Sequence, residues 1–106
     1  MEKYDLIIVG AGPAGIFTAV ELLRHGSKKK MLLVEKGKPV EKRHCPKAEV
    51  GHCVNCRPTC AITTGFSGAG AFSDGKLYIS FQVGRDLPDL IGEHLAQEQI
   101  HYTHTI

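Results

Sequence analysis

The sequence contains no tryptophan, and aromatic residues make up only 7% of its 106 positions. It has no internal repeat and no apolar stretch long enough to cross a membrane, which takes about 20 apolar residues. The longest such stretch, Leu6–Val20, has 15 residues and is interrupted by three glycines and a proline. The pattern does not match a secretory signal either, because acidic Glu2 and Asp5 precede the apolar stretch where basic residues would be needed. We therefore expect a cytoplasmic protein.

Several catalytic signatures are also missing. There is no Ser, His and Asp set in triad order, no phosphate-loop lysine and no clear carboxylate pair. The composition is otherwise ordinary for a soluble globular domain, with 42% hydrophobic residues, 23% charged residues and a net charge of +2. A chain of this length suits one small domain of roughly 100 residues. Any two-domain enzyme would therefore be represented here only in part.

The charge is unevenly distributed along the chain. Residues 24–47 carry nine Lys and Arg side chains against two Glu, so the remainder is net negative. Such a basic segment can contact nucleic acid or an anionic ligand. Because no aromatic residue is interleaved with the basic ones, we expect a solvated surface. We predict no nucleic-acid partner and no membrane partner.

Residues 3–35 predict a strand–helix–strand unit. The continuous apolar run Leu6–Val9 is typical of a strand buried on both faces of a parallel sheet. Apolar residues recur at helical spacing from Pro13 onward, and Gly26 is expected to end that helix. A second apolar run, Met31–Val34, follows. The whole unit has about the 30 residues that such a crossover needs.

The remainder of the chain has weaker patterns. Residues 36–60 lack periodicity and hold all four cysteines, which indicates a long functional loop. Residues 61–75 are small and glycine-rich. Alternating apolar and polar residues predict a strand over 76–83. Apolar residues at helical spacing predict one helix over 86–106.

The motif Gly10-Ala11-Gly12-Pro13-Ala14-Gly15 joins the first expected strand to the helix. Gly10 permits a tight turn, Gly12 lets the backbone approach a pyrophosphate, and Gly15 lets the helix pack closely on the strand. The exposed amides at the helix N-terminus receive phosphate charge. Glu35 lies 20 residues after Gly15, where a carboxylate accepts hydrogen bonds from ribose hydroxyls. Together these features predict a Rossmann-like α/β unit that binds a dinucleotide.

This region resembles the N-terminal FAD-binding segment of the large flavoproteins with two dinucleotide-binding domains. The resemblance is carried by DLIIVGAGPAG at residues 5–15 and LLVEKG at residues 32–37. It implies that the dinucleotide is FAD, with its pyrophosphate at Gly10–Gly15 and its ribose at Glu35. Lys36 joins the predicted site, because a basic residue commonly follows the acidic residue in that group.

Residues 43–77 resemble a family of uncharacterised FAD-dependent dehydrogenases, whose members run to several hundred residues. The resemblance is carried by RHCP at residues 43–46, by the later cysteines and by GFSGAGAFSDGKL at residues 65–77. It implies that the glycine-rich segment lies against the flavin side of FAD, where small residues let the backbone approach closely. The residues it places there are Gly68, Ala69, Gly70, Ser73 and Asp74. The alternative is a glycine-rich hairpin that leads into the strand expected over 76–83.

The four cysteines, Cys45, Cys53, Cys56 and Cys60, lie within 16 residues. Cys53, Cys56 and Cys60 match the C-x2-C-x3-C part of an iron–sulfur run, but the gap before them is seven residues where two are expected. A zinc site is the other metal candidate, with His44 and His52 as further ligands. A redox-active Cys53–Cys56 dithiol and thiols without direct function are alternatives.

The sequence thus predicts the N-terminal portion of an FAD-binding domain over residues 1–106, belonging to an FAD-dependent oxidoreductase of the dehydrogenase class. The expected parts are the unit over 3–35, the cysteine-rich excursion over 36–60, the flavin-side segment and strand over 61–83, and the helix over 86–106. The catalytic residues, the substrate and the electron acceptor are not identified. The alternatives are an NAD-binding dehydrogenase fragment and a non-catalytic metal-binding module. Because two strands alone leave apolar faces uncovered, we expect the isolated domain to be incomplete and prone to aggregate.

Overall fold

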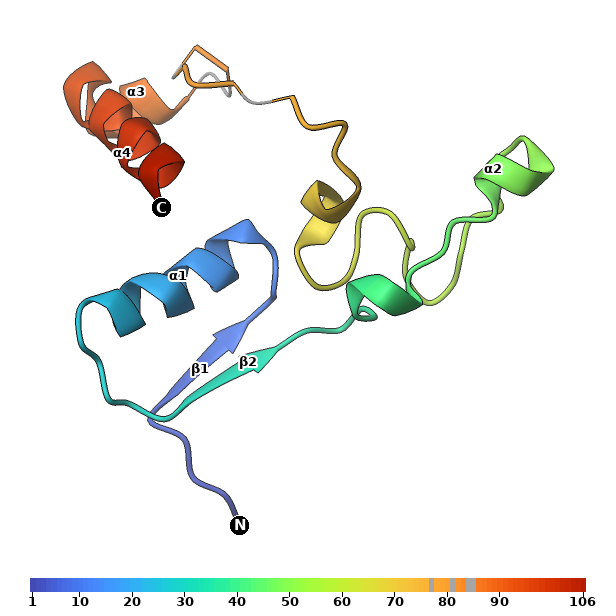
Figure 1. Ribbon diagram of the computed structural model, residues 1–106, viewed down its shortest axis with the longest axis horizontal. Coiled ribbons are helices and arrows are strands. Elements are labelled where there is room, and N and C mark those ends of the chain that lie inside the picture. The colour runs from blue at the N-terminus through green and yellow to red at the C-terminus, as the bar shows by residue number, and fades with distance from the viewer. Residues whose placement is uncertain (77, 81, 84–85) are drawn as a thin grey trace. The chain divides into compact units, whose positions relative to one another are not determined.

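The computed structural model describes residues 1–76, 78–80, 82–83 and 86–106, which form two units, Met1–Ser73 and Asp74–Ile106 (Figure 1). The first unit contains β1 (Leu6–Val9), α1 (Pro13–Arg24), β2 (Met31–Val34), the 3-10 helix η1 (Val40–Lys42), α2 (Lys47–Val50) and the 3-10 helix η2 (Gly68–Phe72). The second unit contains α3 (Leu87–Ile91) and α4 (Glu93–Thr105).

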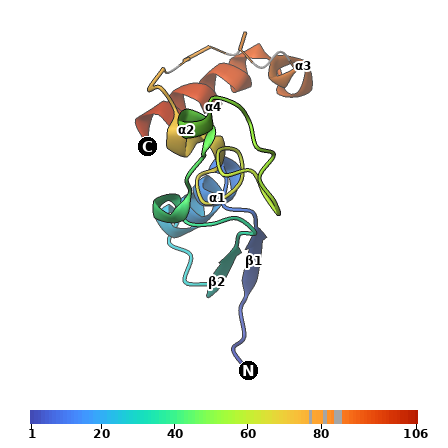
Figure 2. The same ribbon diagram turned by 90° about the vertical axis from the view of Figure 1, so that its right-hand side faces the viewer.

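The first unit is an α/β structure built on one strand–helix–strand crossover. β1 and β2 are parallel neighbours, in a register that pairs Leu6 with Met31 and Val9 with Val34. Figure 2 shows the two strands side by side, with α1 connecting them. The predicted fold class is therefore confirmed, although β1 is shorter than the strand expected from residue 3.

The ends of α1 follow directly from its sequence. Pro13 occupies the first helical position, where the missing N–H costs no hydrogen bond. Gly26 follows the helix with φ of 76°, and its N–H donates to the Leu23 carbonyl at 3.0 Å. The next amide, that of Ser27, donates to the Leu22 carbonyl at 2.9 Å. This left-handed ending is the one that a glycine favours, as the sequence predicted.

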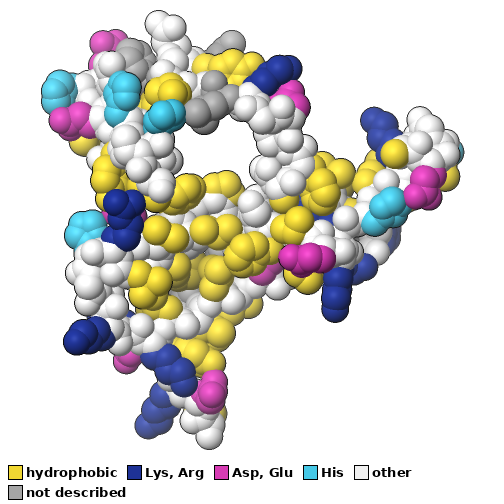
Figure 3. Space-filling view, viewed as in Figure 1, with side chains coloured by type: hydrophobic (Ala, Val, Ile, Leu, Met, Phe, Trp, Pro, Cys, Tyr) yellow, Lys and Arg dark blue, Asp and Glu magenta, His cyan; other side chains and the backbone are white. Residues whose placement is uncertain are grey.

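The sheet is covered on one face only. Leu6 and Ile8 are half-buried, whereas Ile7 is 57% exposed and Val9 is 84% exposed. Hydrophobic side chains accordingly lie at the surface over the strand–helix–strand unit (Figure 3). Ile7 and Val9, which share the second face of β1, are thus left uncovered, as expected for two strands without the further elements of a parallel sheet.

Two predictions for the later part of the chain also need correction. In the described part of 76–83, namely 76, 78–80 and 82–83, the expected strand is not formed, and the remaining two positions lie outside the described residues. The single helix expected over 86–106 is divided at Gly92, which has φ of 81° and ψ of 151° and so cannot continue a helix. Within the described ranges, no helix has the length and apolar character needed to cross a membrane.

Candidate dinucleotide site

The glycines of the first loop have the backbone geometry that their spacing predicts. Gly10 has φ of 102°, a conformation that side chains oppose, and its N–H donates to the Val34 carbonyl at 2.7 Å. A Cβ atom on Gly15 would lie 2.0 Å from the Gly10 carbonyl oxygen, so α1 approaches the loop more closely than any other residue allows. A Cβ on Gly12 would meet nothing within 4 Å. Gly12 therefore leaves open space, where a ligand can approach the backbone.

The N-terminus of α1 is electrostatically suited to an anion. It has no side-chain cap and no acidic residue in its first turn. Since Pro13 has no N–H, the first-turn amides are those of Ala14 and Gly15, which have no acceptor four residues earlier in the helix. These amides and the helix dipole favour a negatively charged group such as a phosphate.

Glu35 lies directly beside this loop. Its Oε2 accepts the backbone N–H of Ala11 at 2.8 Å, and its Oε1 accepts the backbone N–H of Gly37 at 2.8 Å. These two amides, with the charge of the exposed Lys36, hold the pKa of the Glu35 carboxyl below its ordinary value. Each carboxylate oxygen keeps the capacity for a second hydrogen bond, and the side chain is partly exposed. Glu35 can therefore accept hydroxyl groups from a ligand while it holds the loop.

The second glycine-rich segment lies against the first. The Ser67 N–H donates to the Ala11 carbonyl at 2.7 Å, across 56 positions of sequence. A Cβ on Gly68 would lie 3.7 Å from Pro13 Cδ and 3.9 Å from Gly12 Cα. The structure thus brings Gly68, one of the predicted flavin-side residues, to the surface where the phosphate-binding motif begins its helix. The sequence alone contained no signal for this contact.

The other predicted flavin-side residues occupy different environments. Ala69 and Gly70 are exposed on η2, and Ser73 follows η2 at the end of the first unit. Asp74 belongs to the second unit, where its Oδ2 lies 3.0 Å from Lys76 Nζ. Lys76 also lowers the pKa of the Asp74 carboxyl through hydrogen bonds from its side chain and backbone. Gly68 is thus the predicted flavin-side residue that lies against Gly12 and Pro13 of the dinucleotide motif.

Arg43 is buried and binds the backbone of the glycine-rich segment over residues 61–72. It is only 6% exposed and is the one buried charged residue in the part of the chain that the structure describes. Its guanidinium lies 4.7 Å from the centre of the Phe72 ring. Its guanidinium also donates hydrogen bonds to four backbone carbonyls, those of Ala61, Ile62, Phe66 and Gly68. The expectation that the basic segment 24–47 is solvated is therefore wrong at this position.

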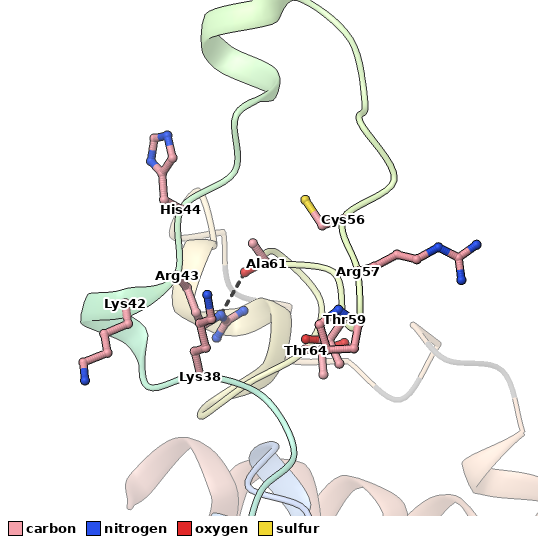
Figure 4. A pocket seen from close by; sticks show the side chains of 10 residues that line it. Lys38, Lys42, Arg43, His44, Cys56, Arg57, Thr59, Ala61 and Thr64 are labelled. Atoms are coloured by element: carbon pink, nitrogen blue, oxygen red, sulfur yellow. Dashed lines mark hydrogen bonds between the residues drawn. The ribbon is translucent and has the colours of Figure 1, made fainter.

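The close-up in Figure 4 shows Arg43 directed toward the Ala61 carbonyl, at the edge of a cavity of about 200 Å³. Lys42 and Arg57 also line this cavity, but their charged ends point away from it in the view. Arg43 is the buried cation of this lining. Its guanidinium holds the loop over 61–72 together with two backbone hydrogen bonds, from the Phe66 N–H to the Lys38 carbonyl and from the Ser67 N–H to the Ala11 carbonyl.

The predicted metal site is not formed. In the described ranges, no three His, Cys, Asp or Glu side chains lie close enough together to hold a metal ion. The two histidines proposed as further ligands have other partners, since His44 Nε2 lies 2.8 Å from Glu49 Oε1 and His52 Nδ1 lies 3.0 Å from the Val50 carbonyl. The cysteines Cys45, Cys53, Cys56 and Cys60 are free thiols that line a common cavity. The iron–sulfur and zinc predictions thus have no support from the geometry.

The geometry defines a dinucleotide-binding α/β unit, and comparison with known proteins specifies the dinucleotide. The family described as "FAD binding domain" matches residues 3–57, just over half of the chain. This range includes β1, α1, β2 and Glu35. The chain belongs to this FAD-binding domain family.

Two relatives share part of the chain. An "Uncharacterized protein" of Clostridium beijerinckii is 41% identical over 71 residues, which are 67% of this chain and 13% of the relative. The "Putative FAD-dependent oxidoreductase LodB" of Marinomonas mediterranea is 51% identical over 37 residues, 35% of this chain and 10% of that protein. The chain therefore spans only about a tenth of the length of either relative. No solved structure matches it.

Proposed function

We propose that this chain holds the ADP half of FAD in a flavin-dependent oxidoreductase of the dehydrogenase class. The observation that carries the proposal is the position of the ionised Glu35 carboxylate beside the Gly10–Gly15 loop, in a chain of the FAD-binding domain family. A carboxylate at this place accepts the ribose hydroxyls of an adenine dinucleotide. The oxidoreductase name of the Marinomonas relative supports the reaction class.

The chain's own contribution is to bind and orient the cofactor. The first-turn amides of α1 and the open backbone at Gly12 receive the pyrophosphate, and Glu35 receives the ribose. Gly68 extends the same surface toward the flavin side, with Ala69, Gly70, Ser73 and Asp74 as further candidate contacts. FAD, when bound, supplies the hydride or electron transfer. We also propose a small-molecule substrate and a cytoplasmic location, in keeping with four free thiols.

Titration of the chain with FAD, followed by quenching of flavin fluorescence, tests this proposal. We expect FAD to bind and NAD to compete poorly. Glu35→Gln removes the charge that accepts the ribose hydroxyls and should weaken FAD binding about tenfold or more. Glu41→Gln, on the exposed helix η1, is the matched control and should leave the affinity unchanged. Tighter binding of NAD than of FAD, or equal effects of the two substitutions, would overturn the assignment.

A further inference from the structure

The four thiols form a feature that the proposed dinucleotide site does not use. Cys45 precedes α2, and the other three cysteines follow it, yet all four line one open cavity of about 450 Å³. Cys53 and Cys60 are exposed, whereas Cys45 and Cys56 are half-buried. A cavity of this volume lies in the range of small-molecule sites. We call it the cysteine pocket.

Cys60 has an environment that favours a nucleophile. The hydroxyl and backbone N–H of Thr63, the backbone N–H of Ile62 and the positive charge of Arg43 together hold the pKa of the Cys60 thiol below its ordinary value. A thiolate, and not a thiol, is the species that attacks sulfur. Cys53, by contrast, donates its S–H to Asn55 Oδ1 at 3.7 Å.

We propose that the cysteine pocket is a thiol–disulfide exchange site, in which Cys60 attacks a small-molecule disulfide and Cys56 completes the exchange. The two residues line the same cavity and are separated by only three positions, Arg57, Pro58 and Thr59. Cys56 is the less exposed of the two, as suits the second cysteine. The basic side chain of Arg57 at the cavity favours an acidic disulfide.

The exchange balances in two steps. The Cys60 thiolate attacks one sulfur of the disulfide, forms a mixed disulfide and releases the first small-molecule thiolate. Cys56 then loses its proton to the released thiolate and attacks Cys60 Sγ, which forms the Cys56–Cys60 disulfide and releases the second small-molecule thiolate. Two protein thiols are oxidised and one external disulfide is reduced to two thiols. No metal and no flavin takes part, so the proposal does not depend on FAD binding.

The test uses the reduced, metal-free chain with oxidised glutathione as the probe. Reaction is stopped with an alkylating agent at increasing times, and the modified cysteines are located by mass spectrometry. We expect Cys60 to acquire glutathione first and then to appear in a disulfide with Cys56. Cys56→Ser should trap the glutathione on Cys60, and Cys60→Ser should abolish the exchange. Gln97→Ala, at an exposed position on α4 outside the cysteine pocket, is the control that should leave the rate unchanged.

Two further experiments distinguish a Cys60 that is activated by the cysteine pocket from a thiol that reacts because it is exposed. Thr63→Val removes the hydroxyl that lowers the pKa of the Cys60 thiol and should slow the first step about threefold or more. The same reaction in concentrated urea supplies the rate for an unfolded chain, and Cys60 in the folded chain should exceed it. Equal rates in the two conditions, first reaction at another cysteine, or protection of all four thiols by one equivalent of Zn²⁺ would overturn the proposal.

Discussion

The carboxylate of Glu35 accepts the backbone N–H of Ala11 at 2.8 Å, joining the end of β2 to the glycine loop that follows β1. The same side chain also accepts the N–H of Gly37. Glu35 thus fixes two turns of the backbone before any ligand binds. Each oxygen of the Glu35 carboxylate can accept more than one hydrogen bond. Glu35 can therefore hold the backbone and accept ribose hydroxyls at the same time.

This arrangement predicts a pH dependence of stability. The pKa of Glu35 is lower in the folded chain than its unfolded value of about 4.3. Glu35 therefore stabilises the fold above the unfolded pKa, and this contribution is lost as the pH falls through the folded pKa. Urea unfolding measured between about pH 6 and pH 3 should show a loss of unfolding free energy that is smaller in Glu35→Gln. Parallel curves for the two proteins would show that Glu35 has no such role.

The glycines of the first loop predict two separable effects. Gly15→Ala would place Cβ 2.0 Å from a backbone oxygen, so it should lower the free energy of unfolding by about 1–3 kcal/mol. Gly12→Ala meets no atom within 4 Å and should leave stability nearly unchanged while weakening FAD binding. Thermal unfolding and FAD titration of both variants test this. A stability loss of the same size in Gly12→Ala would contradict the assigned roles.

Arg43 predicts a local effect on the glycine-rich segment. Arg43→Met keeps an apolar chain but leaves four carbonyls without their donor, and should cost about 2–4 kcal/mol. Hydrogen exchange should then rise in residues 61–72 more than in β1 and α1. Lys42→Met, next to it on an exposed position, is the matched control. Unchanged exchange over 61–72 in Arg43→Met would show that other contacts hold the segment.

The parts of the fold that the sequence predicted are those that depend on neighbouring residues. β1, α1 and β2 follow from an apolar run, a helical period and a second apolar run. Gly10 and Gly15 follow from local backbone requirements that a motif records directly. The hydrogen bond between Glu35 and Ala11 was not predicted, although both residues follow parallel strands that end at the same edge of the sheet.

The parts that could not be predicted depend on distant residues. A charged run gives no indication that Arg43 is the member surrounded by carbonyls, because those carbonyls come from residues 61–68. Alternating side chains over 76–83 gave a strand pattern, but a strand also needs a neighbouring strand to pair with. The cysteine spacing predicted a set of metal ligands. The two histidines that would add to this set, His44 and His52, contact other groups in the structure.

The uncovered face of the sheet gives the last prediction. Ile7 is 57% exposed beside the still more exposed Val9, and apolar surface of this kind promotes association. We expect the 106-residue chain to associate as its concentration rises and to bind a hydrophobic dye. Ile7→Thr keeps a β-branched side chain, so it should reduce both effects without disrupting β1.

Sedimentation velocity and dye fluorescence, measured over a range of concentrations, test this expectation. Leu90→Gln, at an exposed apolar position on α3 in the second unit, is the control for a general loss of apolar surface. If the sheet face drives association, Ile7→Thr has the larger effect, because Ile7 lies beside the exposed Val9 on a strand that can pair with a second chain. A chain that stays monomeric and unfolds cooperatively would show that one covered face is enough for this unit to be stable.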